Sequence, residues 1–171
     1  FSLVLFNTQH SLAQAPAIEW QNTIGGNSND YLRSIAQTVD VGYILGGASA
    51  SSISGDKTEA SFGDLDYWVV KLDTNGNIGW QNAIGGNGSD NLNCIQQTSD
   101  GGYILGGSST SGISGDKTEA NMGLYEDYWV VKLDSNGNIH WQNTIGGSAG
   151  DYLTSIQQTA DGGYILGGYS N

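Results

Sequence analysis

Short apolar runs separated by polar turns extend along this chain, and no stretch keeps a helical period over ten residues. Between residues 34 and 84 these runs predict four strands, at Ser34–Thr38, Tyr43–Ser49, Asp66–Leu72 and Ile78–Ile84. The last run alternates apolar and polar positions, as in a strand with one covered face. The third run is apolar at nearly every position, as in a strand covered on both faces. The pattern predicts an all-β fold.

The segments between the predicted strands have the chemistry of turns and loops. Val39–Gly42 and Asp73–Asn77 contain Asp, Asn and Gly, which favour tight hairpin turns. A long polar loop, Ala50–Leu65, joins the second strand to the third. The pair Gly46-Gly47 leaves the second strand without side-chain bulk, which predicts close approach by a neighbouring sheet. We therefore expect four antiparallel strands joined in chain order.

The same unit recurs along the chain. Trp-Gln-Asn begins at residues 20, 80 and 141, and Gly-Tyr-Ile-Leu-Gly-Gly begins at residues 42, 102 and 163. Two full repeats, about 32–84 and 92–145, and partial repeats at both ends make up residues 16–171. Four-stranded sheets repeated radially are the blades of a β-propeller, and a β-solenoid is the alternative. We predict an incomplete β-propeller whose ring is closed by further blades of the same chain, because closure needs roughly 4–8 blades.

The composition excludes several classes of function. The chain has 5 Lys and Arg residues against 17 Asp and Glu residues, for a net charge of −12, so nucleic acids and anionic membranes are poor partners. No apolar run is long enough to predict a membrane span. Two His residues and one Cys residue argue against Ser-His-Asp catalysis and against a zinc site in this chain.

The first fifteen residues lack the repeat motifs. Phe1–Phe6 is a short apolar run, and the small residues in Ser11-Leu12-Ala13 or Ala13-Gln14-Ala15 suit a cleavage site. This arrangement predicts the end of a secretory signal peptide over residues 1–15, and a strand-forming or disordered N-terminus is the alternative. The signal peptide predicts a secreted, extracellular or cell-surface protein.

The repeat motifs resemble those of known propeller families. Asp-Tyr-Trp-Val-Val-Lys-Leu-Asp begins at residues 66 and 127, and it combines with the Gly-Tyr-Ile-Leu-Gly-Gly string. In these motifs the chain resembles the propeller-like repeats of secreted Bacteroidota surface proteins, which implies export and a location at the cell surface. The turn before Trp80 is similar to the tryptophan-docking motif of quinoprotein propellers. That resemblance implies that Trp80 and Trp141 pack between neighbouring blades.

The turn at Thr98–Gly102 is similar to the Asp-box of sialidase propellers, which implies a structural role for it. The chain has neither the adjacent Cys pair of a quinone site nor the arginine cluster of a sialidase. Neither activity therefore carries over to these repeats. We expect no catalytic residue here, because the acidic groups recur in successive units whereas a glycosidase uses one pair.

Calcium is the cofactor hypothesis for the Asp-Asn turns. Oxygen-bearing side chains alternate there around a Gly, as at the start of a calcium loop, and a plain hairpin turn is the alternative. The candidate ligands are Asp73, Asn75, Asn77, Asp134, Asn136 and Asn138.

The polar loop is the candidate ligand-binding surface. Ile53–Ala60 recurs unchanged as Ile113–Ala120, which predicts either a repeated binding surface or a recent duplication. The candidate binding residues are Asp56, Lys57, Glu59, Asp116, Lys117 and Glu119. Structural roles are expected for Trp20, Trp68, Trp80, Trp129 and Trp141.

These observations predict a secreted or cell-surface repeat module with a binding or structural role and no catalysis of its own. A polysaccharide or another surface protein is the expected partner. The alternative is a fragment of a propeller enzyme, a hydrolase or a quinoprotein-like protein, whose active site lies in other blades.

Overall fold

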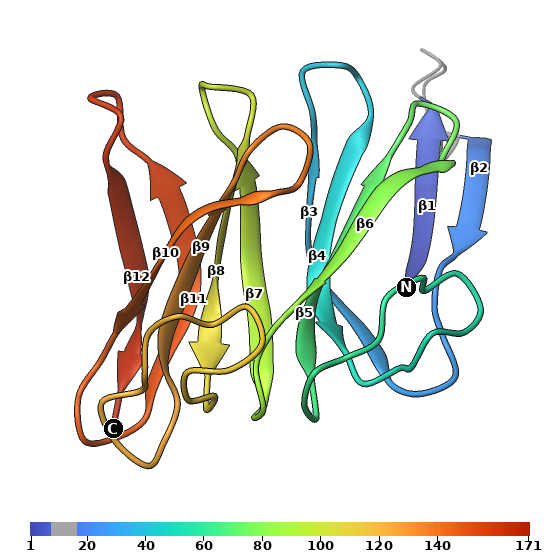
Figure 1. The fold of residues 1–171 in the computed structure, drawn as a ribbon. Helices are drawn as coiled ribbons and strands as arrows, with labels where there is room; N and C mark the ends of the chain where they lie inside the picture. The colour runs from blue at the N-terminus through green and yellow to red at the C-terminus, as the bar shows by residue number, and fades with distance from the viewer. Residues whose placement is uncertain (8–16) are drawn as a thin grey trace.

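The computed structural model describes residues 1–7 and 17–171, which contain twelve strands and no helix (Figure 1). All named strand pairs are antiparallel, so the all-β prediction is confirmed. In these described ranges no helix could cross a membrane. The strands are β1 (Ser2–Asn7), β2 (Ala17–Thr23), β3 (Asp30–Gln37), β4 (Tyr43–Ser49), β5 (Asp66–Leu72), β6 (Ile78–Ile84), β7 (Asp90–Gln97), β8 (Tyr103–Ser109), β9 (Asp127–Leu133), β10 (Ile139–Ile145), β11 (Asp151–Gln158) and β12 (Tyr164–Ser170).

The strands form four sheets that follow one another in chain order. The first sheet is β1-β2, the second is β3-β4-β5-β6, the third is β7-β8-β9-β10 and the fourth is β11-β12. Figure 1 shows the four sheets side by side from the N-terminus to the C-terminus. The repeated four-stranded antiparallel sheet is confirmed, and it differs from the parallel coils expected of a β-solenoid. Closure of these sheets into a propeller ring stays a proposal.

Each boundary between sheets is filled by its own hydrophobic core. Trp68 and Val70 of β5 pack toward the first sheet together with Phe1 and Ile24. The opposite face of β5 packs on the third sheet through Tyr67 and Val69. Every residue of β5 is buried, which confirms that this strand is covered on both faces.

The glycine pairs allow the sheets to approach closely, as predicted. A Cβ built on Gly46 would lie 2.6 Å from a methyl carbon of Leu92 in the third sheet. The equivalent atom on Gly106 would lie 2.5 Å from Leu153 in the fourth sheet. Any larger side chain at these positions would push the sheets apart.

The first strands of successive sheets lie close together. β3 contacts β7, and β7 contacts β11, whereas no comparable contact joins β6 to β10 in the described part of the chain. The sheets therefore converge at their first strands and diverge toward their fourth strands. This is the arrangement that a radial set of blades requires.

The N-terminal residues form a strand, which was the alternative to a signal peptide in the sequence analysis. Phe1 exchanges backbone hydrogen bonds with Ile24, and β1 pairs with β2 as β5 pairs with β6. The Phe1 ring lies 5.0 Å from Trp68, as Tyr67 lies 4.8 Å from Trp129 one sheet later. Phe1–Asn7 thus corresponds to the third strand of a four-stranded sheet. The predicted cleavage sites lie outside the described residues, and cleavage stays a prediction.

Candidate functional site

The Trp-Gln-Asn motifs join each sheet to the next. Trp80 meets Tyr103 of the third sheet edge to face, with ring centroids 5.7 Å apart. Its ring also lies against Gly137, where a Cβ would come within 2.9 Å of the indole. Gly137 has a φ of 89°, which also favours glycine. Asn82 Nδ2 donates to the carbonyl of the same glycine. Trp80 therefore packs between sheets, as the tryptophan-docking resemblance implied.

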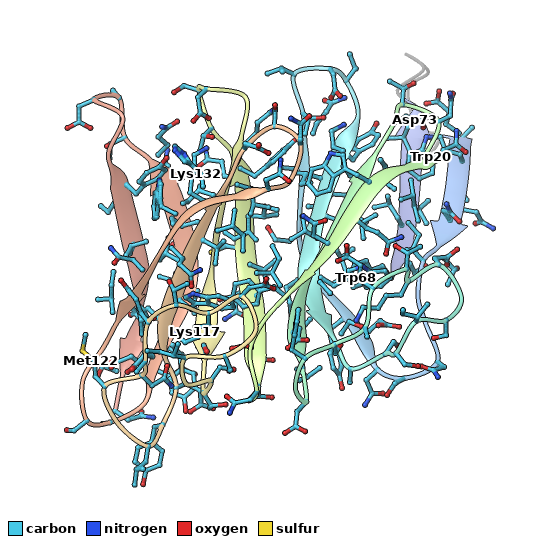
Figure 2. The ribbon with its side chains drawn as sticks, in the orientation of Figure 1. Trp20, Trp68, Asp73, Lys117, Met122 and Lys132 are labelled. Carbon is cyan, nitrogen blue, oxygen red and sulfur yellow. The ribbon has the colours of Figure 1, made fainter. Side chains whose placement is uncertain are left out.

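The same docking occurs at the other two copies of the motif. Trp20 packs edge to face on Tyr43, and Trp141 packs in the same way on Tyr164. Figure 2 shows Trp20 at the same end of the sheets as Asp73, which lies in the turn that receives the indole. Trp68 and Trp129 have a different structural role from these docking tryptophans. Each indole is buried within a core and donates a hydrogen bond to a Gln of the next strand.

The Asp-Asn turns use their oxygen atoms internally. Asp73 Oδ1 accepts hydrogen bonds from the backbone N–H groups of Asn75 and Asn77, at 2.8 and 2.9 Å. Its Oδ2 accepts a third hydrogen bond from Asn77 Nδ2. These bonds lower the pKa of Asp73, with the Asn77 side chain as the main cause. Asp134 makes the same contacts with Asn136 and Asn138.

This geometry favours the hairpin interpretation of the turns, because a calcium ion would have to replace these donors. No group of three or more His, Cys, Asp or Glu side chains is arranged to hold a metal ion in residues 1–7 and 17–171. Calcium binding by these turns stays a prediction.

In the repeated polar loop, all six candidate side chains make hydrogen bonds within the protein itself. Lys57 is 1% exposed, donates to the Ser51 carbonyl and to Ser61 Oγ, and lies 5.9 Å from the Trp68 ring. Burial lowers the pKa of Lys57. Glu59 accepts a hydrogen bond from the Ala83 N–H at 2.7 Å.

Asp56 and Asp116 join the loop to the segment that follows the preceding sheet, whereas Lys117 and Glu119 join it to the last strand of its own sheet. Asp56 Oδ2 accepts from the Gly25 N–H, and the Asp56 N–H donates to the Gly25 carbonyl at 2.9 Å. In the next copy Asp116 contacts Gly85 in the same way, while Lys117 donates to Thr144 and Glu119 accepts from the Thr144 N–H. These contacts favour a structural role for the six side chains.

Another repeated contact joins the first hairpin of a sheet to its third strand. Lys71 Nζ lies 2.9 Å from Asp40 Oδ2, and Lys132 Nζ lies 2.9 Å from Asp100 Oδ2. The Thr38 hydroxyl donates to Asp40 and, together with Lys71, lowers the pKa of this carboxyl to about 2. The Asp-box-like turn therefore has a structural role here, as the resemblance implied.

Buried carboxyls at the start of the third strands were missed by the sequence analysis. Asp66 and Asp127 are 0% exposed, and one oxygen of each, Oδ1, has no hydrogen-bond partner. Burial raises the pKa of Asp66 to about 6, and the nearby Asp90 carboxyl adds to the effect. The sequence analysis placed Asp66 at the start of a strand covered on both faces, but it did not single out this carboxyl as buried.

Several surface cavities lie between neighbouring sheets, and two of them bear on the candidate site. The first, of about 710 Å³, lies between the polar loop and the next sheet and is bordered by Glu59, Phe62 and Asp116. The second, of about 410 Å³, is bordered by the first strands β3, β7 and β11. Arg33, Asn91 and Tyr152 line the second cavity, and none of them was a candidate site residue in the sequence analysis.

Comparison with known proteins adds no functional assignment. No protein-family model matches the chain, and no curated protein matches it. The function therefore has to be inferred from the residues and their contacts.

Proposed function

We propose that this chain is part of an exported β-propeller that acts as a recognition or structural module at the cell surface, without catalysis by these blades. One observation carries the proposal. The polar side chains that recur in every unit, in the Trp-Gln-Asn motif, the Asp-Asn turns, the hairpin and the polar loop, bind the protein's own backbone and side chains. Residues used in this way stabilise the fold, and a ligand would therefore be bound by other residues.

Two features of the chain support export and the class of partner. The resemblance to repeats of secreted Bacteroidota surface proteins supports a cell-surface location. The net charge of −12 disfavours nucleic acid, so a polysaccharide or another surface protein is the partner we propose. A ring of blades from the same polypeptide would supply the rest of the propeller.

The proposal can be tested on the full-length protein. We expect it in the extracellular or surface fraction of its producing cells, and we expect no turnover of glycoside, ester or quinone substrates above the buffer control. Asp66 and Asp127 are then replaced by Asn, and circular dichroism checks that the variant is folded. Turnover that disappears in this variant would overturn the non-catalytic assignment. Retention in the cytoplasm would overturn the proposed location.

A further inference from the structure

The cavity beside the first strands has an unusual lining. We call it the first-strand pocket and define it by Arg33, Asn91, Asn93, Glu126, Tyr152 and Thr154. Three sheets contribute to it, because these residues come from β3, from β7 and the loop before β9, and from β11. Glu126 belongs to the same polar loop as Lys117. Figure 2 shows Lys117 toward one end of the sheets and Lys132 toward the other.

The strand residues of this pocket differ between the copies of the repeat. Tyr31, Asn91 and Tyr152 occupy one equivalent position, and Arg33, Asn93 and Thr154 occupy another. The Leu between these two positions is identical in all three copies, as are the Asp before them and the Ile after them. Positions 34 and 36 of the first strand also vary between the copies, but the pocket is where divergent residues from three copies meet.

Exposure alone does not explain this divergence. Thr58 and Thr118 are exposed and identical, and the exposed Asn75 is identical to Asn136. Other exposed positions differ between the copies, such as Val39, Ser99 and Ala160, but residues from three copies meet at this cavity, which gives it an asymmetric chemistry.

Arg33 is the one cationic side chain among the described residues that is both exposed and free of an ion pair. The other four are lysines: Lys71 and Lys132 pair with aspartates, and Lys57 and Lys117 are 1% exposed. The Arg33 guanidinium lies 5.4 Å from the Tyr31 ring centroid and makes no salt bridge. An unpaired guanidinium is suited to bind a carboxylate through two parallel hydrogen bonds.

The rest of the pocket suits a sugar. Tyr152 stacks on Tyr169 with ring centroids 4.9 Å apart and planes 19° apart, and its hydroxyl donates to Glu126 at 2.9 Å. Asn93 donates to the Leu153 carbonyl through Nδ2, which leaves its Oδ1 as an acceptor for a hydroxyl. Amides, hydroxyls and a tyrosine face match a ligand with many hydroxyl groups and a flat ring.

We propose that the first-strand pocket binds a carboxylated saccharide, with Arg33 contacting the carboxylate and Asn91, Asn93 and Tyr152 contacting the sugar ring. This inference rests on the proposed function, since it names the site and the ligand class of the recognition module. The acidity of the chain does not prevent such binding. At physiological ionic strength repulsion from carboxylates beyond about 8 Å is largely screened. Within the pocket, the Glu126 carboxylate accepts the Tyr152 hydroxyl hydrogen bond, and Arg33 is the contact for the charge of the ligand.

The test compares two ligands that differ only in their charge. The full chain is titrated with trigalacturonate and with the same trisaccharide whose carboxyls have been reduced to alcohols, by calorimetry in physiological salt. We expect trigalacturonate to bind at least about tenfold more tightly, since hydrogen bonds between charged groups exceed neutral ones by that amount. Arg33→Ala should remove this preference, and Arg33→Lys should restore only part of it.

Two tyrosine variants provide a matched pair. Tyr152→Ala should weaken both ligands, whereas Tyr125→Ala, at a tyrosine that is 57% exposed and outside the pocket, should weaken neither. Melting curves check that each variant is folded. If Tyr152→Ala unfolds through loss of its bond to Glu126, the exposed Arg33 variants still decide the test.

The outcomes separate this inference from the proposed function. Failure of both ligands to bind at millimolar concentration, or a charge preference that survives Arg33→Ala, overturns the pocket assignment and leaves the scaffold role intact. Chromatography of the trisaccharide after incubation tests the other claim. Cleavage of the sugar would overturn the absence of catalysis while supporting the site.

Discussion

Replacing Asp66 with Asn should stabilise this protein at neutral pH but not in acid. The Asp66 carboxyl is 0% exposed, and only its Oδ2 has a partner, the Phe62 N–H. Burial raises the pKa of Asp66 from 3.8 to about 6, against the opposing effect of the Phe62 hydrogen bond. An Asn side chain keeps an oxygen to accept that bond and carries no charge.

The magnitude follows from the difference between the folded and unfolded pKa values. Below pH 3.8 the carboxyl is protonated in both states, and Asp66 adds no dependence on pH. Between pH 3.8 and about 6 the unfolded chain loses this proton before the folded protein does, so stability falls as the pH rises. At about 1.36 kcal/mol per pKa unit, the loss approaches 3 kcal/mol above pH 6. The Asp66→Asn variant escapes this loss, although burying an amide offsets part of the gain.

Urea unfolding, followed by tryptophan fluorescence from about pH 3.5 to 8, measures this difference. The advantage of Asp66→Asn over the unmodified protein should grow by about 2–3 kcal/mol across that range. Asp64→Asn is the control, since this exposed carboxyl lies in the loop just before β5 and its removal should change stability by less than about 0.5 kcal/mol. A difference for Asp66→Asn that is constant with pH would refute the raised pKa.

Four further measurements test other parts of the structure. Val41 has a φ of 65° where the other copies have Gly101 and Gly162, so Val41→Gly should raise the unfolding free energy by about 1 kcal/mol, whereas Val39→Gly in the same turn should not. Deletion of residues 1–15 should cost about 3 kcal/mol or more by urea unfolding, because it removes the Phe1 contact with Trp68 and the partner of β2; unchanged stability would favour a leader peptide. Burial raises the pKa of the Cys94 thiol to about 11, so iodoacetamide at about pH 7.5 should label it far more slowly in the folded protein than in urea. Millimolar calcium should leave the melting temperature unchanged, because the Asp73 oxygens already accept three hydrogen bonds, and a rise of several degrees would support the calcium hypothesis instead.

The strands were predictable where the apolar pattern is bounded by turn residues. The predicted bounds of β4, β5 and β6 coincide with those in the structure. β3 was expected from Ser34, but it begins at Asp30. Its pairing register shifts between Leu32 and Ser34, and such a bulge interrupts the alternation by which a strand is recognised.

The candidate site was less predictable because it depends on contacts between sheets. The docking of Trp80 was expected from its motif, but the burial of Lys57 and Asp66 depends on which loop covers which strand. The role of Phe1–Asn7 was obscured because these residues lack the Asp-Tyr-Trp signature of the other third strands. The divergent positions 31 and 33 were visible in the sequence, and comparing the copies at each strand position would have identified them.

The positions of the lysines explain why this acidic chain presents an even more acidic surface. Lys57 and Lys117 lie over the rings of Trp68 and Trp129, and the other two lysines fasten hairpins to third strands. Each lysine is therefore used inside a repeat, so duplication of the repeat adds acidic surface without adding accessible positive charge. A protein partner would have to supply its own Lys or Arg side chains. For an anionic ligand, Arg33 is the one exposed and unpaired Lys or Arg side chain among the described residues. The position of that side chain, at a junction of three first strands, is consequently the feature that makes one part of the repeat array chemically different from the rest.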